Sequence, residues 1–189
     1  IDPHLKWQLR RKLKQIHHEL KLTLIYVTHD QVEALTFADQ VMVMTRGRAV
    51  QVGSAADLFE RPSHTFVGHF IGSPGMNFLA GHVDEMGFHV GGTTLALPPG
   101  RALPAGAIKL GVRPEYVVPV PAHTAGAVAA TVSQVQDVGT HVMLSASLAG
   151  HTLKARLSPD AVQWTPGEAV WLKVMGEHTC FYMNEEIVP

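Results

Sequence analysis

The stretch Leu22–Leu35, LTLIYVTHDQVEAL, most constrains the fold of this chain. Its first part, Leu22–Val27, is a short apolar run without alternation, which predicts a strand buried on both faces in a parallel sheet. Asp30 can cap a following helix, and Glu33 stands at the spacing of a capping box. Because ligands in open α/β sheets bind just past the carboxyl ends of strands, the turn that holds His29 is a candidate site. A turn histidine that only packs locally is the alternative.

The first residues predict an amphipathic helix over Pro3–Leu20. Asp2 is a favoured N-cap, and proline is favoured at the first helical position. Apolar residues then recur at helical spacing, and much of the remaining surface is basic. A solvated face is the favoured interpretation of this charge run, with a nucleic-acid-binding helix as the alternative.

Four more elements are expected before the composition changes at Gly72–Gly75. Ser54 should cap a short helix, because Asp57 stands at the capping-box position, and Pro62 should stop that helix. The four elements are a strand over 40–44, a hairpin strand over 49–52, this helix through residue 59 and a second helix over 64–71. The change of composition places a domain boundary near Pro74, between residues 1–74 and 75–189.

The sequence of residues 75–189 predicts many short strands separated by turns, a pattern that is typical of a small β-barrel or sandwich. Gly150 and Pro166-Gly167 mark two of the turns. The expected strands cover 78–84, 87–90, 93–96, 107–112, 125–135, 140–148, 151–156, 169–174 and 180–183. The predicted fold class is therefore an α/β fragment followed by an all-β barrel domain.

The charge, the cysteine count and the lengths of the apolar runs exclude several classes of protein. The net charge is −1 with histidine neutral, and Cys180 is the single cysteine, which excludes an internal disulfide and fits a reducing compartment. No apolar run approaches the length of a membrane span. Residues 75–189 hold 6 Lys or Arg against 9 Asp or Glu, which argues against nucleic-acid binding by the second part.

The segment VTHDQVEALTFADQVMVMTRGRAVQVGSAADLFERP resembles the region after the catalytic carboxylate in the ATPase subunits of ABC transporters, and FIGSPGMNFLAG narrows this to importers of sugars and glycerol phosphate. The resemblance implies that His29 is the switch histidine, which contacts the γ-phosphate of ATP. Ile1-Asp2 resembles the end of the D-loop, which implies that Asp2 reaches across an ATPase dimer and helps to place the attacking water. The alternative is that Asp2 only caps a helix.

LGVRPEYV, Leu110–Val117, resembles a signature of the oligosaccharide-binding-type regulatory domain of these importers, where each module is built from discontinuous sequence. Arg113, Pro114 and Glu115 are expected to mark this fold and not a ligand site. The resemblance implies ATP and Mg²⁺ as cofactors of the full-length protein. It also implies an ATPase homodimer, permease subunits, a possible regulatory protein on the second domain and a peripheral place on the cytoplasmic face of the bacterial inner membrane.

The 189 residues contain no phosphate-binding loop of the form GxxxxGK[ST] and no LSGGQ-type signature. We therefore expect a fragment that is inactive alone and needs no cofactor. No metal site is expected, because His17-His18 and the pair His64 and His69 have poor spacing for shared ligation and neither C-x-x-C nor HExxH occurs. Ser145 and Ser147 lack the frame of a hydrolase nucleophile and should lie on one exposed strand face.

Two functional classes remain. The first is the ATP-hydrolysing, energy-coupling subunit of an importer for sugars or glycerol-3-phosphate, whose transported solute the sequence does not specify. The second is a free-standing oligosaccharide-binding-type module that binds a ligand or an oligonucleotide.

Overall fold

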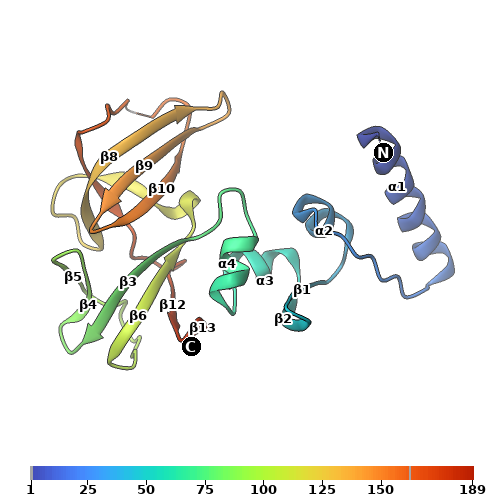
Figure 1. Ribbon diagram of the computed structural model, residues 1–189, viewed down its shortest axis with the longest axis horizontal. Helices are drawn as coiled ribbons and strands as arrows, with labels where there is room; N and C mark the ends of the chain where they lie inside the picture. The colour runs from blue at the N-terminus through green and yellow to red at the C-terminus, as the bar shows by residue number, and fades with distance from the viewer. Residues whose placement is uncertain (1, 162) are drawn as a thin grey trace.

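The structure, a computed structural model, describes residues 2–161 and 163–189. Helices and one β-hairpin form the part up to residue 71, and the rest is mainly β-structure (Figure 1). Helix α1, Pro3–Leu20, forms as predicted, and the Asp2 carboxylate caps it by accepting from the His4 N–H at 2.8 Å. Figure 1 shows α1 at one end of the molecule, joined to the rest by an extended segment.

The predicted strand over Leu22–Val27 is wrong. These residues have an extended backbone without strand pairing, and Ile25 and Val27 are 84% and 91% exposed. A parallel strand depends on neighbouring strands for its hydrogen bonds, and none of the described strands pairs with this segment. The following helix α2, Gln31–Phe37, forms with Asp30 as its N-cap.

The next elements follow the sequence prediction closely. Strands β1, Val41–Thr45, and β2, Arg48–Gly53, pair as an antiparallel hairpin. Helix α3, Ala55–Glu60, begins with the predicted capping box of Ser54 and Asp57, and helix α4, Thr65–Phe70, follows. A small core lies among these elements, with Leu58 and Val67 fully buried.

Within the described residues, the β-region consists of a six-stranded and a five-stranded sheet, both antiparallel. The six-stranded sheet has the order β13-β12-β6-β3-β4-β5, and the other has the order β10-β9-β8-β11-β7. The strands are β3 Asn77–Asp84, β4 Gly87–Val90, β5 Thr93–Leu95, β6 Gly106–Val112, β7 Val118–Val120, β8 Ala127–Asp137, β9 Val142–Leu148, β10 His151–Leu157, β11 Ala169–Lys173, β12 Cys180–Met183 and β13 Glu186–Ile187.

The first sheet is built from two separate stretches of sequence. The chain leaves it after β6, passes through the short 3₁₀-helix Pro114–Tyr116 and forms the second sheet. It then returns to add β12 and β13 beside β6. This arrangement agrees with the discontinuous modules that the resemblance implied. The predicted fold class, an α/β fragment followed by an all-β barrel-like domain, is confirmed.

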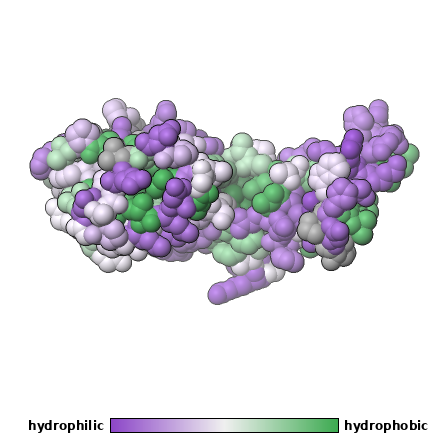
Figure 2. Space-filling model, turned by 90° about the horizontal axis from the view of Figure 1, so that it is seen from above, coloured by the Kyte–Doolittle hydropathy of each residue, from purple (hydrophilic) through white to green (hydrophobic). Residues whose placement is uncertain are grey.

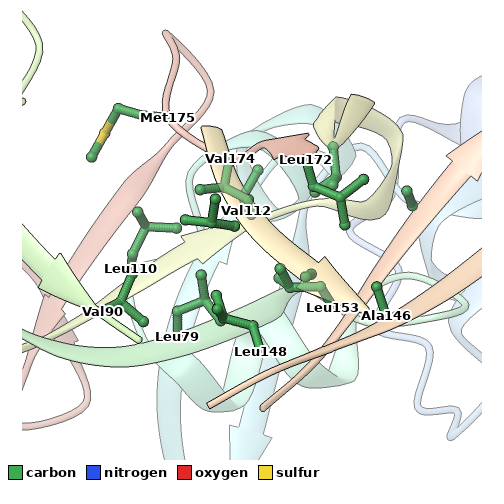
Figure 3. Packing of buried hydrophobic residues seen from close by; sticks show 14 of the residues in the cluster. Leu79, Val90, Leu110, Val112, Ala146, Leu148, Leu153, Leu172, Val174 and Met175 are labelled. Atoms are coloured by element: carbon green, nitrogen blue, oxygen red, sulfur yellow. The ribbon is translucent and has the colours of Figure 1, made fainter. Parts of the chain in front are cut away.

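The main core lies between the two sheets. Side chains alternate between buried and exposed along the strands, as expected for sheets with one solvated face. Leu79 and Leu110 from the first sheet and Leu153 and Leu172 from the second are fully buried, and Figure 3 shows them lying together. Ser145 and Ser147 lie on the outer face of β9, as predicted.

Strands β7 and β13 and the 3₁₀-helix were not predicted. Each is only two or three residues long, so its own sequence pattern carries little signal. The two strands are defined by their pairing, β7 with β11 and β13 with β12. Of the described helices, none is both long and apolar enough to cross a membrane.

Candidate functional site

The turn Thr28-His29-Asp30 is held by a chain of hydrogen bonds. The Thr28 hydroxyl accepts from the Asp30 N–H at 3.0 Å, and it donates to Glu33 Oε2 at 2.9 Å. The Asp30 carboxylate accepts from the Glu33 N–H at 3.1 Å and so begins α2. His29 is exposed at the tip of this turn. The backbone around His29 is therefore fixed, while its ring is free to meet a ligand from solvent.

Glu33 joins this turn to α1. Its side chain is buried, and it accepts hydrogen bonds from Arg10 and, at 3.3 Å, from the Tyr26 hydroxyl. Lys6 Nζ lies 3.9 Å from the same carboxylate. The Thr28 hydroxyl first, and then Arg10 and Lys6, hold the pKa of Glu33 below its ordinary value. The residue thus connects two helices and the His29 turn through one carboxylate.

The capping box predicted for Glu33 is wrong. In a capping box the third helical residue would accept from the N-cap N–H, but here the Asp30 N–H donates to Thr28. The two Glu33 oxygens are already engaged by Thr28, Tyr26 and Arg10. Sequence spacing could not anticipate this, because Arg10 lies 23 residues away.

Asp2 has the structural role that its position predicts. It is exposed, and its side chain caps α1. Ile1, the other residue of the proposed D-loop end, lies outside the described residues. The hydrogen bonds of the described residues do not join Asp2 to His29, so the structure does not bring these two predicted site residues into contact.

Apolar side chains are exposed around this region. On α1, Leu5, Leu9 and Leu20 are 56%, 57% and 63% exposed, and the extended segment 22–27 is exposed throughout. Figure 2 shows hydrophilic residues over much of the α1 end of the molecule, with apolar residues exposed beside them. Extended exposed apolar surface of this kind is typical of sites that contact another protein, a membrane or a ligand.

Arg113, in the GVRPE segment, is a buried structural residue. Its guanidinium donates to the backbone carbonyls of Phe59 at 2.9 Å, Gly68 at 3.0 Å and Leu58 at 3.4 Å, and also to that of Ile71. Burial lowers its pKa. Arg113 therefore fastens α3 and α4 to the six-stranded sheet, which agrees with its expected role as a marker of the fold.

Other contacts join the same two parts. The Tyr182 hydroxyl donates to the Pro62 carbonyl at 2.8 Å, and burial raises the pKa of this tyrosine. Tyr116 donates to Glu60 at 2.5 Å, which raises the pKa of Tyr116 to about 12. The predicted boundary near Pro74 stays a prediction, and these hydrogen bonds cross it.

An open cavity of about 290 Å³ lies beside these residues, between the end of β6 and the loop before β12. Tyr116 and His178 stack on one side of it, with ring centroids 3.9 Å apart, and the His178 ring contacts Glu60. Their polar atoms are thus already engaged within the protein. The His29 turn does not line this cavity.

Two domain families match this chain. Residues 72–117 match the MalK OB fold domain, and residues 110–181 match the TOBE domain. The two matches overlap on Leu110–Val117, the GVRPE segment that leads from one sheet to the other. The two sheets therefore form a domain of the oligosaccharide-binding type, similar to the MalK OB fold and TOBE domains.

Relatives specify this class further. The chain is 39% identical over 176 residues to the sn-glycerol-3-phosphate import ATP-binding protein UgpC of Escherichia coli O1:K1 / APEC, covering 91% of this chain and 49% of that protein. It is 37% identical over 185 residues to the ABC transporter ATP-binding protein y4oS of Sinorhizobium fredii, covering 91% of this chain and 46% of that protein. An ATP-binding protein of Brucella abortus is 35% identical over 189 residues, 100% of this chain and 53% of that protein.

The predicted resemblance to the C-terminal region of sugar and glycerol-3-phosphate importer ATPases is confirmed by these matches. The chain spans about half the length of the curated relatives that it matches. The roles of His29 and Asp2 stay predictions.

Proposed function

We propose that the full-length protein is the energy-coupling subunit of an ABC importer for sugars or glycerol-3-phosphate, and that it hydrolyses ATP to drive uptake. The main support is the identity of 39% with a glycerol-3-phosphate import ATP-binding protein. In the Brucella relative the similarity extends over all 189 residues, including the His29 turn.

His29 is the residue of this chain that we assign to the reaction. In phosphoryl transfer, catalysis rests on positioning and on stabilising charge at the transferred phosphoryl group. An exposed imidazole on a turn fixed by Thr28 and Glu33 suits a contact with the γ-phosphate. Asp2 would lie at the dimer interface, where its carboxylate helps to order the attacking water.

The test is ATP turnover by the full-length protein with His29→Ala. We expect turnover to fall about 100-fold to 1,000-fold, as for the loss of one group that stabilises the transition state, with nucleotide affinity largely kept. His18→Ala, an exposed histidine on α1, is the matched control and should keep normal turnover. Unchanged hydrolysis by the His29 variant would contradict the assignment.

The 189-residue chain alone should neither hydrolyse ATP nor bind it tightly. Nucleotide sites of this class need backbone N–H groups and a lysine around the phosphates, together with ligands for Mg²⁺. The sequence has no GxxxxGK[ST] loop to supply them. Titration with Mg-ATP in a calorimeter should be flat. Saturable binding at micromolar concentration would show that the chain holds a nucleotide site of its own.

We further propose a homodimer of ATPase subunits that binds permease subunits on the cytoplasmic face of the inner membrane, with the second domain open to a regulatory protein. The exposed apolar side chains of α1 and of segment 22–27 support a contact with other protein at that end. We expect sedimentation of the 189-residue chain to show a weak to moderate dimer, mediated by residues 75–189. ATP should leave its mass distribution unchanged.

A free-standing ligand- or oligonucleotide-binding module is the alternative. It receives less support, because the similarity to ABC ATP-binding proteins extends well beyond residues 72–181, where the domain matches lie. Sequencing the gene upstream of residue 1 distinguishes the two functions. A phosphate-binding loop encoded there would support the importer subunit and contradict the free-standing module.

A further inference from the structure

The outer face of the β3–β4 hairpin brings His82, Asp84 and His89 together. His82 and Asp84 are two residues apart on β3, so they share the solvated face, and the register places His89 directly opposite His82. The two imidazole rings stack with their centroids 4.5 Å apart and 15° between their planes. One ligand atom from each residue lies within 4.8 Å of the other two.

The position of the His89 ring is fixed from both of its nitrogens. Nε2 lies 2.7 Å from Asp84 Oδ1, and Nδ1 lies 2.9 Å from the Thr94 hydroxyl on β5. Metal-ligating histidines commonly engage their second nitrogen with an oxygen in this way, which sets the tautomer and the ring orientation. Thr94 can serve as that partner and leave Nε2 free for an ion.

Hydrogen bonds favour the ionised form of the Asp84 carboxylate. The His89 ring first, and the Met86 N–H after it, hold the pKa of Asp84 below its ordinary value. Its side chain is 48% exposed and that of His89 is 23% exposed, so an ion can reach both from solvent. Of the residues that the structure describes, these three are the only group of three or more His, Cys, Asp or Glu side chains with ligand atoms this close.

We propose that His82, Asp84 and His89 form a binding site for a divalent transition-metal ion, with Zn²⁺ as its first candidate. Two imidazole nitrogens and one carboxylate oxygen are a ligand set that suits zinc, and water can complete the tetrahedron. Zinc ligands at about 2.0–2.2 Å stand roughly 3.4 Å apart in a tetrahedron. Binding therefore requires side-chain rotations that bring ligand atoms now within 4.8 Å of one another to this spacing, with the ion taking the place of the hydrogen bond between His89 and Asp84.

The alternative is that the three residues only stabilise the hairpin through their hydrogen bonds and ring stacking. The two interpretations differ in their response to added metal. A purely structural group leaves the hairpin unchanged in Zn²⁺, whereas a metal site slows hydrogen exchange of the β3 and β4 amides because the ion joins the two strands.

The test uses the 189-residue chain, prepared without an affinity tag and stripped with chelator. Co²⁺ is added as a spectroscopic probe and Zn²⁺ in a calorimeter. We expect one saturable site per chain and a Co²⁺ absorption band typical of four-coordinate geometry. His82→Ala, Asp84→Asn and His89→Ala should each weaken Zn²⁺ binding at least tenfold, and the weaker effect of Thr94→Val should show its supporting role.

Because the chain has 12 histidines, matched controls are essential. The His17→Ala/His18→Ala variant and the His141→Ala variant should bind like the unaltered chain. Circular dichroism should show that each variant is folded, and if His89→Ala unfolds, the exposed His82→Asn carries the test. Absence of saturable binding, or an equal loss of affinity in the control variants, would overturn the proposal. So would Zn²⁺ binding that leaves hydrogen exchange of the hairpin amides unchanged.

Discussion

The side chain of Asn77 pairs with the backbone of Lys154 in the manner of a neighbouring strand. Asn77 Nδ2 donates to the Lys154 carbonyl, and the Lys154 N–H donates to Asn77 Oδ1, both at 2.8 Å. Asn77 begins β3 in one sheet and Lys154 lies in β10 of the other. This buried amide therefore connects the two sheets where their own ladders do not meet.

Asn77→Ala should lower the free energy of unfolding by about 1–3 kcal/mol, because it leaves a backbone donor and acceptor without their partner. Urea unfolding followed by tryptophan fluorescence measures this change. Lys154→Ala is the matched control: only its backbone atoms take part, so its effect should stay within about 0.5 kcal/mol. A large effect of the lysine variant would show that the side chain, and not the backbone pairing, matters.

Arg113→Lys should also destabilise the protein. The guanidinium serves four carbonyls at once, and a lysine offers a single ammonium on a flexible stem that cannot reproduce this fork. We expect a loss of about 3 kcal/mol, since hydrogen bonds from charged donors are among the stronger ones and buried acceptors would be left unpaired. Equilibrium unfolding in urea measures it.

Arg156→Lys is the control for that experiment. Arg156 lies 3.5 Å from Glu115 at the surface, with its side chain 42% exposed. Exposed ion pairs contribute little, so the change should be below about 1 kcal/mol. Equal effects at the two positions would contradict the assignment of Arg113 as the anchor of α3 and α4.

The contact between α1 and α2 should weaken in acid. The pKa of Glu33 is lowered in the folded state, so its contribution to stability is fully present above the unfolded-state pKa of about 4.3. That contribution is lost as the pH falls through the lower folded-state pKa. Hydrogen exchange of residues 4–20, corrected for the intrinsic rate at each pH, should rise in this acid range.

Glu33→Gln should give this faster exchange already at neutral pH and remove its acid dependence. Glu19→Gln, an exposed glutamate near the end of α1 whose Oε1 accepts from Gln15, is the control and should leave exchange nearly unchanged. If the Glu33 variant kept the acid response, another carboxyl group would have to carry it.

Limited proteolysis should remove the first part of the chain before the rest. Residues 21–30 have few described contacts apart from those around Glu33, and α1 carries several basic residues that trypsin can cleave. Mass spectrometry should find early cuts before residue 31 and a resistant product that retains α3, α4 and both sheets. Early loss of the β-region would contradict this order.

Much of the fold could be predicted from sequence because its signals are local. The Asp2 cap of α1 and the Ser54–Asp57 capping box depend on neighbours within a few residues. The hairpin turn at Gly150 also has a local signal, because glycine readily adopts the positive φ that Gly150 has in this turn. The nine strands expected in residues 75–189 all occur, with small changes at their ends.

What could not be predicted depends on distant partners. Segment 22–27 has the composition of a strand, but a strand forms only where neighbouring strands can pair with it, and the composition of the segment does not show whether they are present. Glu33 stands at a capping-box position, but its carboxylate instead accepts hydrogen bonds from Arg10 and Thr28. His82 and His89 do not have a helical ligand spacing; they meet because the two-residue turn between Asp84 and Gly87 sets the register of β3 and β4.

The contacts of the last strand with α4 have a consequence for how the molecule is assembled during synthesis. The Thr65 N–H donates to the Glu185 carbonyl and the Ile187 N–H donates to the Ser63 carbonyl, each at 2.9 Å. The Thr65 and Glu185 side chains also meet, across 120 residues of sequence. Helix α4 is synthesised before residues 185–187 and cannot complete these hydrogen bonds until they have followed. The order in which these segments are synthesised is therefore not the order in which their contacts form.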